Sequence, residues 1–232
     1  MNAADLLAIW EDGRQMPPLR RARLLSTLIP DDASQAGPSI GQTNARLLSL
    51  RRLLFGSAIA GMATCPSCDS KLDVTMRVED FLAACQGHEG SNGTRTMEVD
   101  GRALHFRLPT IEDLEAVDES LSYADAQTQL LRACVHDIDL AQVTQLNEPL
   151  LAEMARLDPL AEPRLALTCE ACGHAFTLAF DVAAFLWREI EGWVARLMGD
   201  VHIIASAYGW SEREILSLSP TRRQVYLDLI CA

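Results

Sequence analysis

Apolar side chains recur at helical spacing along most of the chain. Between residues 3 and 29 they fall on either side of a break that contains Gly and Pro, which predicts two short helices joined by a turn. After a loop rich in Asp, Ser, Pro and Gly, a further helix is expected from about Thr43 to Phe55. The longest helical pattern runs from Val182 to about Tyr208, and Gly209 can end it in a left-handed conformation.

Other stretches alternate apolar and polar residues, the pattern of half-buried β-strands. Residues 72–78 place an apolar side chain at every second position. Residues 94–108 hold two strand patterns around Asp100-Gly101, a dipeptide that favours a type I′ hairpin turn because both central residues need positive φ. We expect this hairpin to extend the sheet that contains the strand at residues 72–78. Residues 165–168 and 176–180 are further expected strands.

Several short signals predict where helices begin. Thr110 is followed three residues later by Asp113, which predicts an N-cap at Thr110. Ser211 and Glu214 have the spacing of a capping box. Pro220 is expected near the start of the last helix, where a missing N–H costs little.

Two C-x-x-C pairs organise the chain: Cys65-Pro66-Ser67-Cys68 and Cys169-Glu170-Ala171-Cys172. Each precedes a predicted strand. Two thiolates separated by two residues can bind one ion from a single turn, and two such turns complete a tetrahedral shell. The spacing therefore predicts one structural zinc ion per chain, with four ligands: Cys65, Cys68, Cys169 and Cys172.

The segments that begin at the two cysteine pairs also match each other. Residues 65–82 and 169–186 align without a gap, so that Val78 meets Val182 and Leu82 meets Leu186. Both segments contain a cysteine turn, a strand, and an acidic residue near the start of an apolar helical stretch. This is the arrangement that a pseudo-twofold zinc ribbon requires.

Three alternatives to zinc remain for the cysteines: a disulfide framework, a thiol redox pair and chance. A redox C-x-x-C normally stands alone in a βαβ context, and a disulfide framework needs an exporting context that is not visible here. His174 and His88 are open as substitutes for one thiolate, although four thiolates already complete the shell.

These patterns predict an α+β fold that is mainly helical, with a central four-cysteine zinc ribbon built from two C-x-x-C knuckles plus a β-hairpin. The expected parts are an N-terminal helical segment (1–61), a ribbon core (62–110 and 164–181), a helical insertion (111–163) and a C-terminal helical lobe (182–232).

Composition narrows the class of protein. A chain of 232 residues with 49% hydrophobic content can bury a sizeable core. No basic region precedes an apolar run at the N-terminus, and charge interrupts the apolar stretches before a membrane could be spanned. The three remaining cysteines, Cys85, Cys134 and Cys231, fit a reducing compartment. We expect a cytoplasmic protein with no membrane partner.

The net charge of −12 repels a polyanion unless basic residues cluster strongly. The basic clusters are short, and each is typical of a solvated helix face or a partner contact. They are Arg20, Arg21 and Arg23; Arg51 and Arg52; and Arg222 and Arg223. We therefore do not expect nucleic acid as the main partner.

No pattern for catalysis is present. The sequence has no phosphate-cradling Gly-rich loop with a lysine, no H-E-x-x-H, no G-x-S-x-G and no EF-hand loop. Four thiolates would also leave no open zinc position for a catalytic water. The sequence thus predicts no catalytic residues, no organic cofactor and no enzyme activity.

Several stretches together resemble a known family. They are Leu6–Glu11, Asn44–Gly56, Phe106–Thr110, Leu165–His174, Phe185–Ile190, and the run from His202 through Tyr208-Gly209-Trp210-Ser211-Glu212 to Leu227. They are similar to zinc-binding baseplate or tail-assembly proteins of contractile-tailed phages and phage-tail-like contractile injection systems. The likeness covers most of the chain.

The resemblance implies a structural or chaperone-like assembly protein of a tail baseplate. Its partners would be tail or baseplate proteins, and the protein itself would be free in the cytoplasm or incorporated in a tail-like particle. The alternative function is a zinc-ribbon nucleic-acid-binding regulator that uses the C-terminal helices with Arg222 and Arg223. A metalloenzyme with an open zinc position is a third hypothesis.

Overall fold

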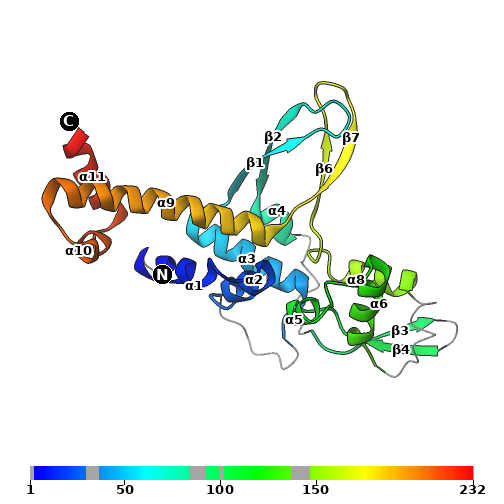
Figure 1. Ribbon diagram of the computed structural model, residues 1–232. Helices are drawn as coiled ribbons and strands as arrows, with labels where there is room; N and C mark the ends of the chain where they lie inside the picture. Colours follow the sequence, from blue (N-terminus) through cyan, green and yellow to red (C-terminus); the bar gives the residue numbers. More distant parts are fainter. Residues whose placement is uncertain (1–2, 30–36, 84–91, 100–101, 137–146, 232) are drawn as a thin grey trace. The chain divides into compact units, whose positions relative to one another are not determined.

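The computed structural model describes residues 3–29, 37–83, 92–99, 102–136 and 147–231 (Figure 1). By the contacts between residues, the chain forms two compact units. One unit joins residues 1–17 to residues 184–232, and the other contains residues 18–183. The four-part division predicted from the sequence stays a prediction.

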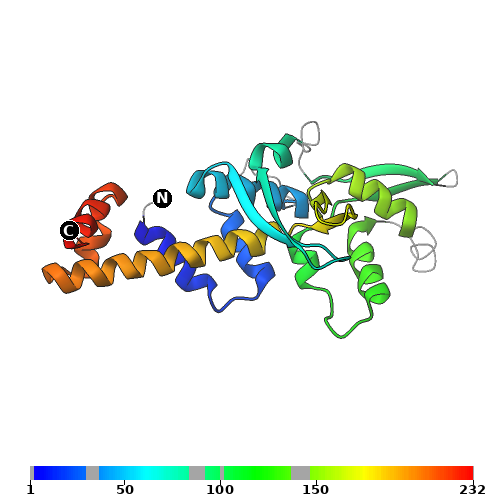
Figure 2. The same cartoon turned by 90° about the horizontal axis from the view of Figure 1, so that it is seen from above.

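The unit that joins the two ends of the chain is helical. Its elements are α1 (Ala3–Gly13), most of α9 (Val182–Tyr208), α10 (Glu212–Leu216) and α11 (Pro220–Cys231). Figure 2 shows α10 and α11 beside the C-terminal end of α9. They pack there around a small apolar core made of Val201, Ile204, Ile215 and Leu227.

The helix boundaries of this unit confirm the predictions made from local signals. Gly209 follows α9 with φ 68° and donates its N–H to the carbonyl of Ala205 at 2.8 Å. Ser211 and Glu214 form both hydrogen bonds of a capping box at α10. Pro220 is the first residue of α11. Local chemistry therefore decides where these helices begin and end.

The second unit contains two β-hairpins of the same design. β1 (Ala58–Thr64) pairs with β2 (Lys71–Arg77), and β6 (Arg164–Thr168) pairs with β7 (Ala175–Ala179), both antiparallel. The helices α2 (Pro18–Ser26), α3 (Ile40–Phe55) and α4 (Val78–Ala83) belong to the same unit. Near the bases of the hairpins, Phe81 stacks on Phe180 with ring centroids 5.4 Å apart.

The segment between the two hairpins forms its own sheet and core. β3 (Arg95–Val99), β4 (Arg102–Phe106) and β5 (Val135–His136) make a three-stranded antiparallel sheet. α6 (Tyr123–Cys134) and α8 (Asn147–Leu157) supply residues to the same apolar core, and α5 (Ile111–Glu115) precedes them. The buried residues are Leu104, Phe106, Leu108, Leu131, Cys134, Leu150 and Met154.

The strand order corrects two expectations. The hairpin over residues 95–106 forms as predicted, but it belongs to this separate sheet and does not extend the ribbon. Its turn, Asp100-Gly101, lies outside the described residues. The strand over residues 58–64 was missed, because Gly61 and the alanines beside it lack the alternation of bulky apolar and polar residues that marks β2.

A buried carboxylate ties the inserted segment to α3. Asp158 is only 6% exposed and accepts a hydrogen bond from the N–H of Gly41 at 2.9 Å, in the first turn of α3. A Cβ at residue 41 would lie 1.8 Å from Asp158 Oδ1, so the close approach requires glycine. Asn44 adds a hydrogen bond to the carbonyl of Leu160 at 2.8 Å.

Candidate metal centre

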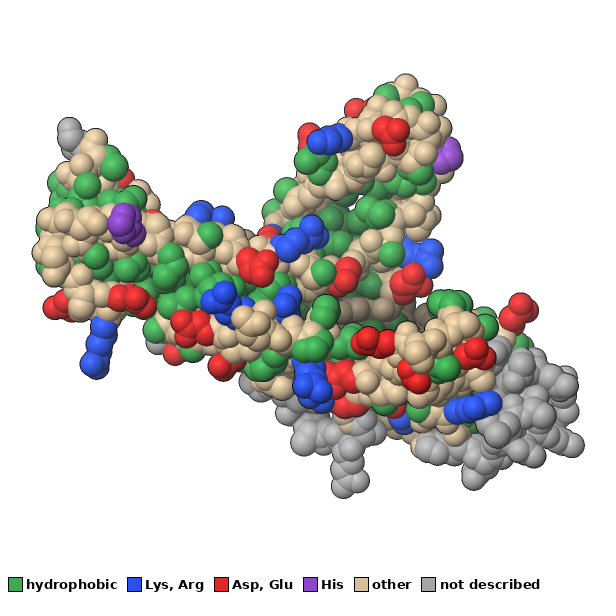
Figure 3. Space-filling view, viewed as in Figure 1, with side chains coloured by type: hydrophobic (Ala, Val, Ile, Leu, Met, Phe, Trp, Pro, Cys, Tyr) green, Lys and Arg blue, Asp and Glu red, His purple; other side chains and the backbone are tan. Residues whose placement is uncertain are grey.

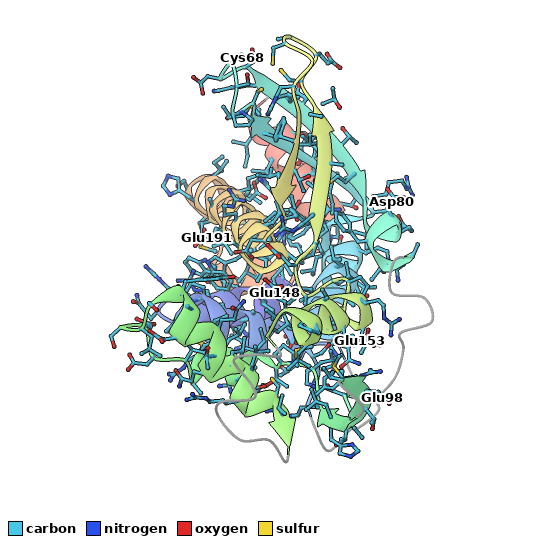
Figure 4. The ribbon with its side chains drawn as sticks, turned by 90° about the vertical axis from the view of Figure 1, so that its right-hand side faces the viewer. Cys68, Asp80, Glu98, Glu148, Glu153 and Glu191 are labelled. Atoms are coloured by element: carbon cyan, nitrogen blue, oxygen red, sulfur yellow. The ribbon has the colours of Figure 1, made fainter. Side chains whose placement is uncertain are left out.

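The four cysteines of the two C-x-x-C pairs meet at one point. Their Sγ atoms all lie within 4.8 Å of one another, at the ends of the two hairpins. Figure 4 shows Cys68 at this end, away from α4, on which Asp80 is labelled. The side chains of Cys65 and Cys169 are buried, whereas those of Cys68 and Cys172 are exposed.

The two cysteine turns have the same backbone hydrogen bonds. In each turn the N–H of the first cysteine donates to the carbonyl five residues later, Ser70 in one and His174 in the other, at 2.9 Å. In each, the N–H four residues later donates back to the carbonyl of the first cysteine, from Asp69 at 3.0 Å and from Gly173 at 2.8 Å.

The repeat extends to backbone angles and strand register. Asp69 and Gly173 occupy the same position of their turns, and both have positive φ, 57° and 72°. Thr64 pairs with Lys71 just as Thr168 pairs with Ala175, one residue before and six after the first cysteine. α4 and α9 then begin at Val78 and Val182, the residues that the gap-free alignment matched. The alignment therefore describes a true structural repeat.

The spacing of the sulfur atoms fits a zinc ion. A tetrahedral zinc with Zn–S bonds of about 2.3 Å places its sulfurs about 3.8 Å apart. Here the Sγ atoms of Cys65 and Cys172 are 3.7 Å apart, and those of Cys68 and Cys169 are 3.6 Å apart. A disulfide would need about 2.05 Å, and the described cysteines are free thiols. The donor set, four sulfurs from two turns, is the one that structural zinc prefers.

The pKa values of the two exposed thiols, Cys68 and Cys172, are shifted in opposite directions. Hydrogen bonds with the side chain and the backbone of Ser70 lower the pKa of Cys68 to about 6. At Cys172 the N–H of His174 acts to lower the pKa, but the neighbouring thiols and burial outweigh it and raise the pKa to about 12. Cys68 therefore ionises more readily than Cys172, whose ionisation is opposed because thiolates repel at these distances.

The histidines considered as substitute ligands do not join the described cluster. The His174 ring lies beside Phe176, with centroids 6.1 Å apart, and only the backbone of His174 takes part in the knuckle. His88 and Cys85 lie outside the described residues. Ser70, whose hydroxyl accepts a hydrogen bond from the Cys68 thiol at 3.3 Å, was not singled out from the sequence. Ser70 follows Cys68 by two residues, just as His174 follows Cys172, and this repeated position is the sequence signal that could have identified it.

In each basic cluster one arginine is buried or paired with carboxylates. Arg223 is 5% exposed and donates to the carbonyl of Leu218 at 3.4 Å, so it does not form an exposed pair with Arg222. Arg51 is buried, and Arg23 lies within 3.5 Å of the carboxylates of Glu112 and Glu115. On the face in Figure 3, basic side chains stand singly among acidic ones. Hence the C-terminal arginines do not form a phosphate track.

No described helix is long and apolar enough to cross a membrane. A comparison with models of known families gave no match, and none of the solved structures matched the chain.

Two curated proteins are similar to part of the chain. Both are named transcriptional repressor NrdR, one from Cupriavidus necator and one from Cupriavidus pinatubonensis. Each is 28% identical to this chain over 131 residues, which is 56% of this chain and 81% of the relative.

These relatives overturn the expectation of a phage-type role. Both carry the name of a regulator of transcription, so the prediction of a baseplate or tail-assembly protein is wrong. The same holds for tail proteins as partners and for the expectation that nucleic acid is not the main partner, and a place in a tail-like particle is left without support. The zinc-ribbon interpretation is retained, because the four cysteines do gather at one site.

The motifs behind the phage resemblance serve the fold. Arg107 binds both carboxylate oxygens of Asp113 at 2.5 and 2.7 Å and also donates to the carbonyl of Ala133. Tyr208 stacks on Trp210, and Trp210 meets the ring of Tyr226 edge-on, with centroids 5.1 and 4.9 Å apart. Residues that hold helices and strands together carry little information about what a protein binds.

Proposed function

We propose that the protein is a regulator of transcription that binds DNA and depends on one structural zinc ion. The observation that carries the proposal is the gathering of four thiols by two copies of one knuckle, in a chain similar to proteins named transcriptional repressors. The proposed ligands are Cys65, Cys68, Cys169 and Cys172. The protein works in a reducing compartment, where its thiols stay available to the metal.

Zinc in this site has a structural role. When bound, it neutralises the thiolates and holds the two hairpin ends together. Four sulfur ligands leave no position for water or substrate, so the site supports no hydrolytic chemistry and the protein is a binding protein, not an enzyme. The chain's own contribution is the pair of matched turns, whose N–H groups at Ser70 and His174 point at Cys68 and Cys172.

The hairpins are the proposed DNA-contacting elements. A two-stranded antiparallel ribbon fits the major groove of B-DNA. Residues 58–77 hold two basic and two acidic groups, so the first hairpin is neutral within a chain of net charge −12. Lys71, the chain's single lysine, is exposed at the start of β2 beside the first knuckle. Arg77 is partly neutralised by Glu79, whose carboxylate lies 3.4 Å away.

The test is binding of the zinc-loaded full chain to labelled random duplex DNA, measured by fluorescence anisotropy at several salt concentrations. Contacts to phosphates make the logarithm of affinity fall linearly with the logarithm of salt concentration. We expect a shallow slope, because few basic groups are available. Lys71→Gln should weaken binding and reduce the slope by about one.

Arg222→Gln is the matched control, since Arg222 is exposed but lies on α11, away from the ribbon in sequence. It should leave the slope unchanged. If the zinc-loaded chain does not bind DNA at low salt, the proposal fails. If Arg222→Gln reduces the slope and Lys71→Gln does not, the contact surface is the C-terminal helices.

A further inference from the structure

The outer edge of β7 is an unpaired strand edge. Within the described residues, β7 pairs only with β6. The carbonyl of His174 and the N–H of Phe180 are both bonded across to the β6 side, at 2.9 and 2.8 Å. Backbone groups alternate between the two sides of a strand. The N–H and C=O groups of the odd-numbered residues Ala175, Thr177 and Ala179 therefore point away from β6.

This edge lacks the features that normally protect strand edges. β7 reads Ala-Phe-Thr-Leu-Ala, with no charge and no proline, and four of its five side chains are exposed. Leu178 is 41% exposed. The corresponding strand of the first hairpin, β2, has Lys71, Asp73 and Arg77 on its exposed face. Charged side chains are a common device against edge-to-edge pairing, so only one of the two matched strands is open to a partner.

We propose that β7 pairs with β7 of a second copy of this chain, in antiparallel orientation about a twofold axis at Thr177. This inference goes beyond the proposed function and does not depend on it. The strand is self-complementary: Thr177 faces its own copy, Ala175 faces Ala179, and Phe176 faces Leu178. The β6–β7 hairpins of the two copies would then form one four-stranded sheet.

Charge favours the edge of β7 over the rest of the surface as the place where two copies meet. Each chain carries a net charge of −12, so two copies repel wherever their acidic surfaces meet. Residues 164–180 contain one basic residue, Arg164, and one acidic residue, Glu170, and β7 itself carries neither. Two copies can therefore approach along β7 without placing like charges opposite each other. The pairing also covers Leu178, and threonine pairs across antiparallel strands are favourable.

The internal repeat supplies a matched control for the test. Thr177 in β7 corresponds to Asp73 in β2, 104 residues earlier, and both have exposed side chains. The zinc-loaded full chain carrying Cys231→Ser, which removes an exposed thiol, is the background for both Thr177→Cys and Asp73→Cys. Facing residues in antiparallel strands are close enough for a disulfide. Mild oxidation should link Thr177→Cys into covalent dimers through the new thiols and should form no such link in Asp73→Cys.

Sedimentation velocity over a wide concentration range gives an independent reading. The unmodified chain should show a monomer–dimer equilibrium, and Thr177→Lys should weaken the dimer by about fivefold or more, because it places like charges directly opposite each other. Zinc content and melting temperature establish that the variant is folded. A monomer at all concentrations would overturn the inference. Equal cross-linking at the two cysteine positions, or an unaltered dimer in Thr177→Lys, would also overturn it.

Discussion

The zinc ribbon and the three-stranded sheet of β3, β4 and β5, here called the inserted sheet, are both small antiparallel structures. Different forces hold them. Strands β2, β6 and β7 of the ribbon bury none of their side chains, and β1 buries only Ile59 and Ala63. In the inserted sheet, Leu104 and Phe106 of β4 are buried with residues of α6 and α8 in one apolar core. The comparison teaches that a pair of hairpins with so few buried side chains needs another source of stability. Here that source is the proposed metal, with the Phe81–Phe180 stack near the bases of the hairpins.

The largest expected effect comes from a zinc ligand in the ribbon. Cys169→Ser should abolish zinc binding and unfold both hairpins, because zinc contributes on the order of 10 kcal/mol to folding in comparable sites. Metal analysis and hydrogen exchange measure the two effects. Exchange should rise over residues 58–77 and 164–179, while the inserted sheet stays protected. Cys231→Ser, which changes an exposed cysteine on α11, is the control. Full zinc content with an unchanged melting temperature in Cys169→Ser would refute the four-cysteine site.

Truncating a side chain in the core of the inserted sheet should destabilise that sheet and leave zinc binding unchanged. Phe106 is fully buried, and Phe106→Ala should cost about 3–5 kcal/mol through lost burial and the cavity left behind. Chemical denaturation measures this loss, and zinc content should not change. Phe176→Ala, on the ribbon, is the matched change at a half-buried ring and should cost less. If Phe106→Ala released zinc while its sheet remained folded, the two regions would not be stabilised separately.

The smallest of these effects concerns an ion pair at the edge of the inserted core. Burial acts to raise the pKa of Asp113, but hydrogen bonds from Arg107 and Thr110 outweigh it and hold the pKa below its ordinary value. Asp113 therefore stabilises the fold above the unfolded pKa of about 4, and this contribution is lost as the pH falls through the lower folded pKa. Asp113→Asn should cost about 1–2 kcal/mol at neutral pH.

Measuring stability against pH checks this sign. The free energies of unfolding of the unmodified chain and of Asp113→Asn should converge in acid. Glu153→Gln, which alters an exposed pair with Arg156, should change stability less at every pH. A difference between the unmodified chain and Asp113→Asn that grew as the pH fell would contradict the assignment.

Local features of this protein were predictable from the sequence because they depend on neighbouring residues. The C-x-x-C spacing, the capping residues Thr110 and Ser211, and the length of α9 all follow from short-range geometry. The gap-free alignment of the cysteine segments also predicted a real repeat, since equal spacing in sequence gives equal turns and register.

Only the tertiary structure decided the features that depend on distant contacts. Whether residues 95–106 join the ribbon or a separate sheet depends on pairing with β5, some thirty residues away. Arg223 looks like half of a basic pair in the sequence but is buried. The sequence by itself determined that two cysteine turns exist and match. The fold decided that their four sulfurs lie within 4.8 Å and that the edge of β7 is left open, because both depend on how segments a hundred residues apart come together.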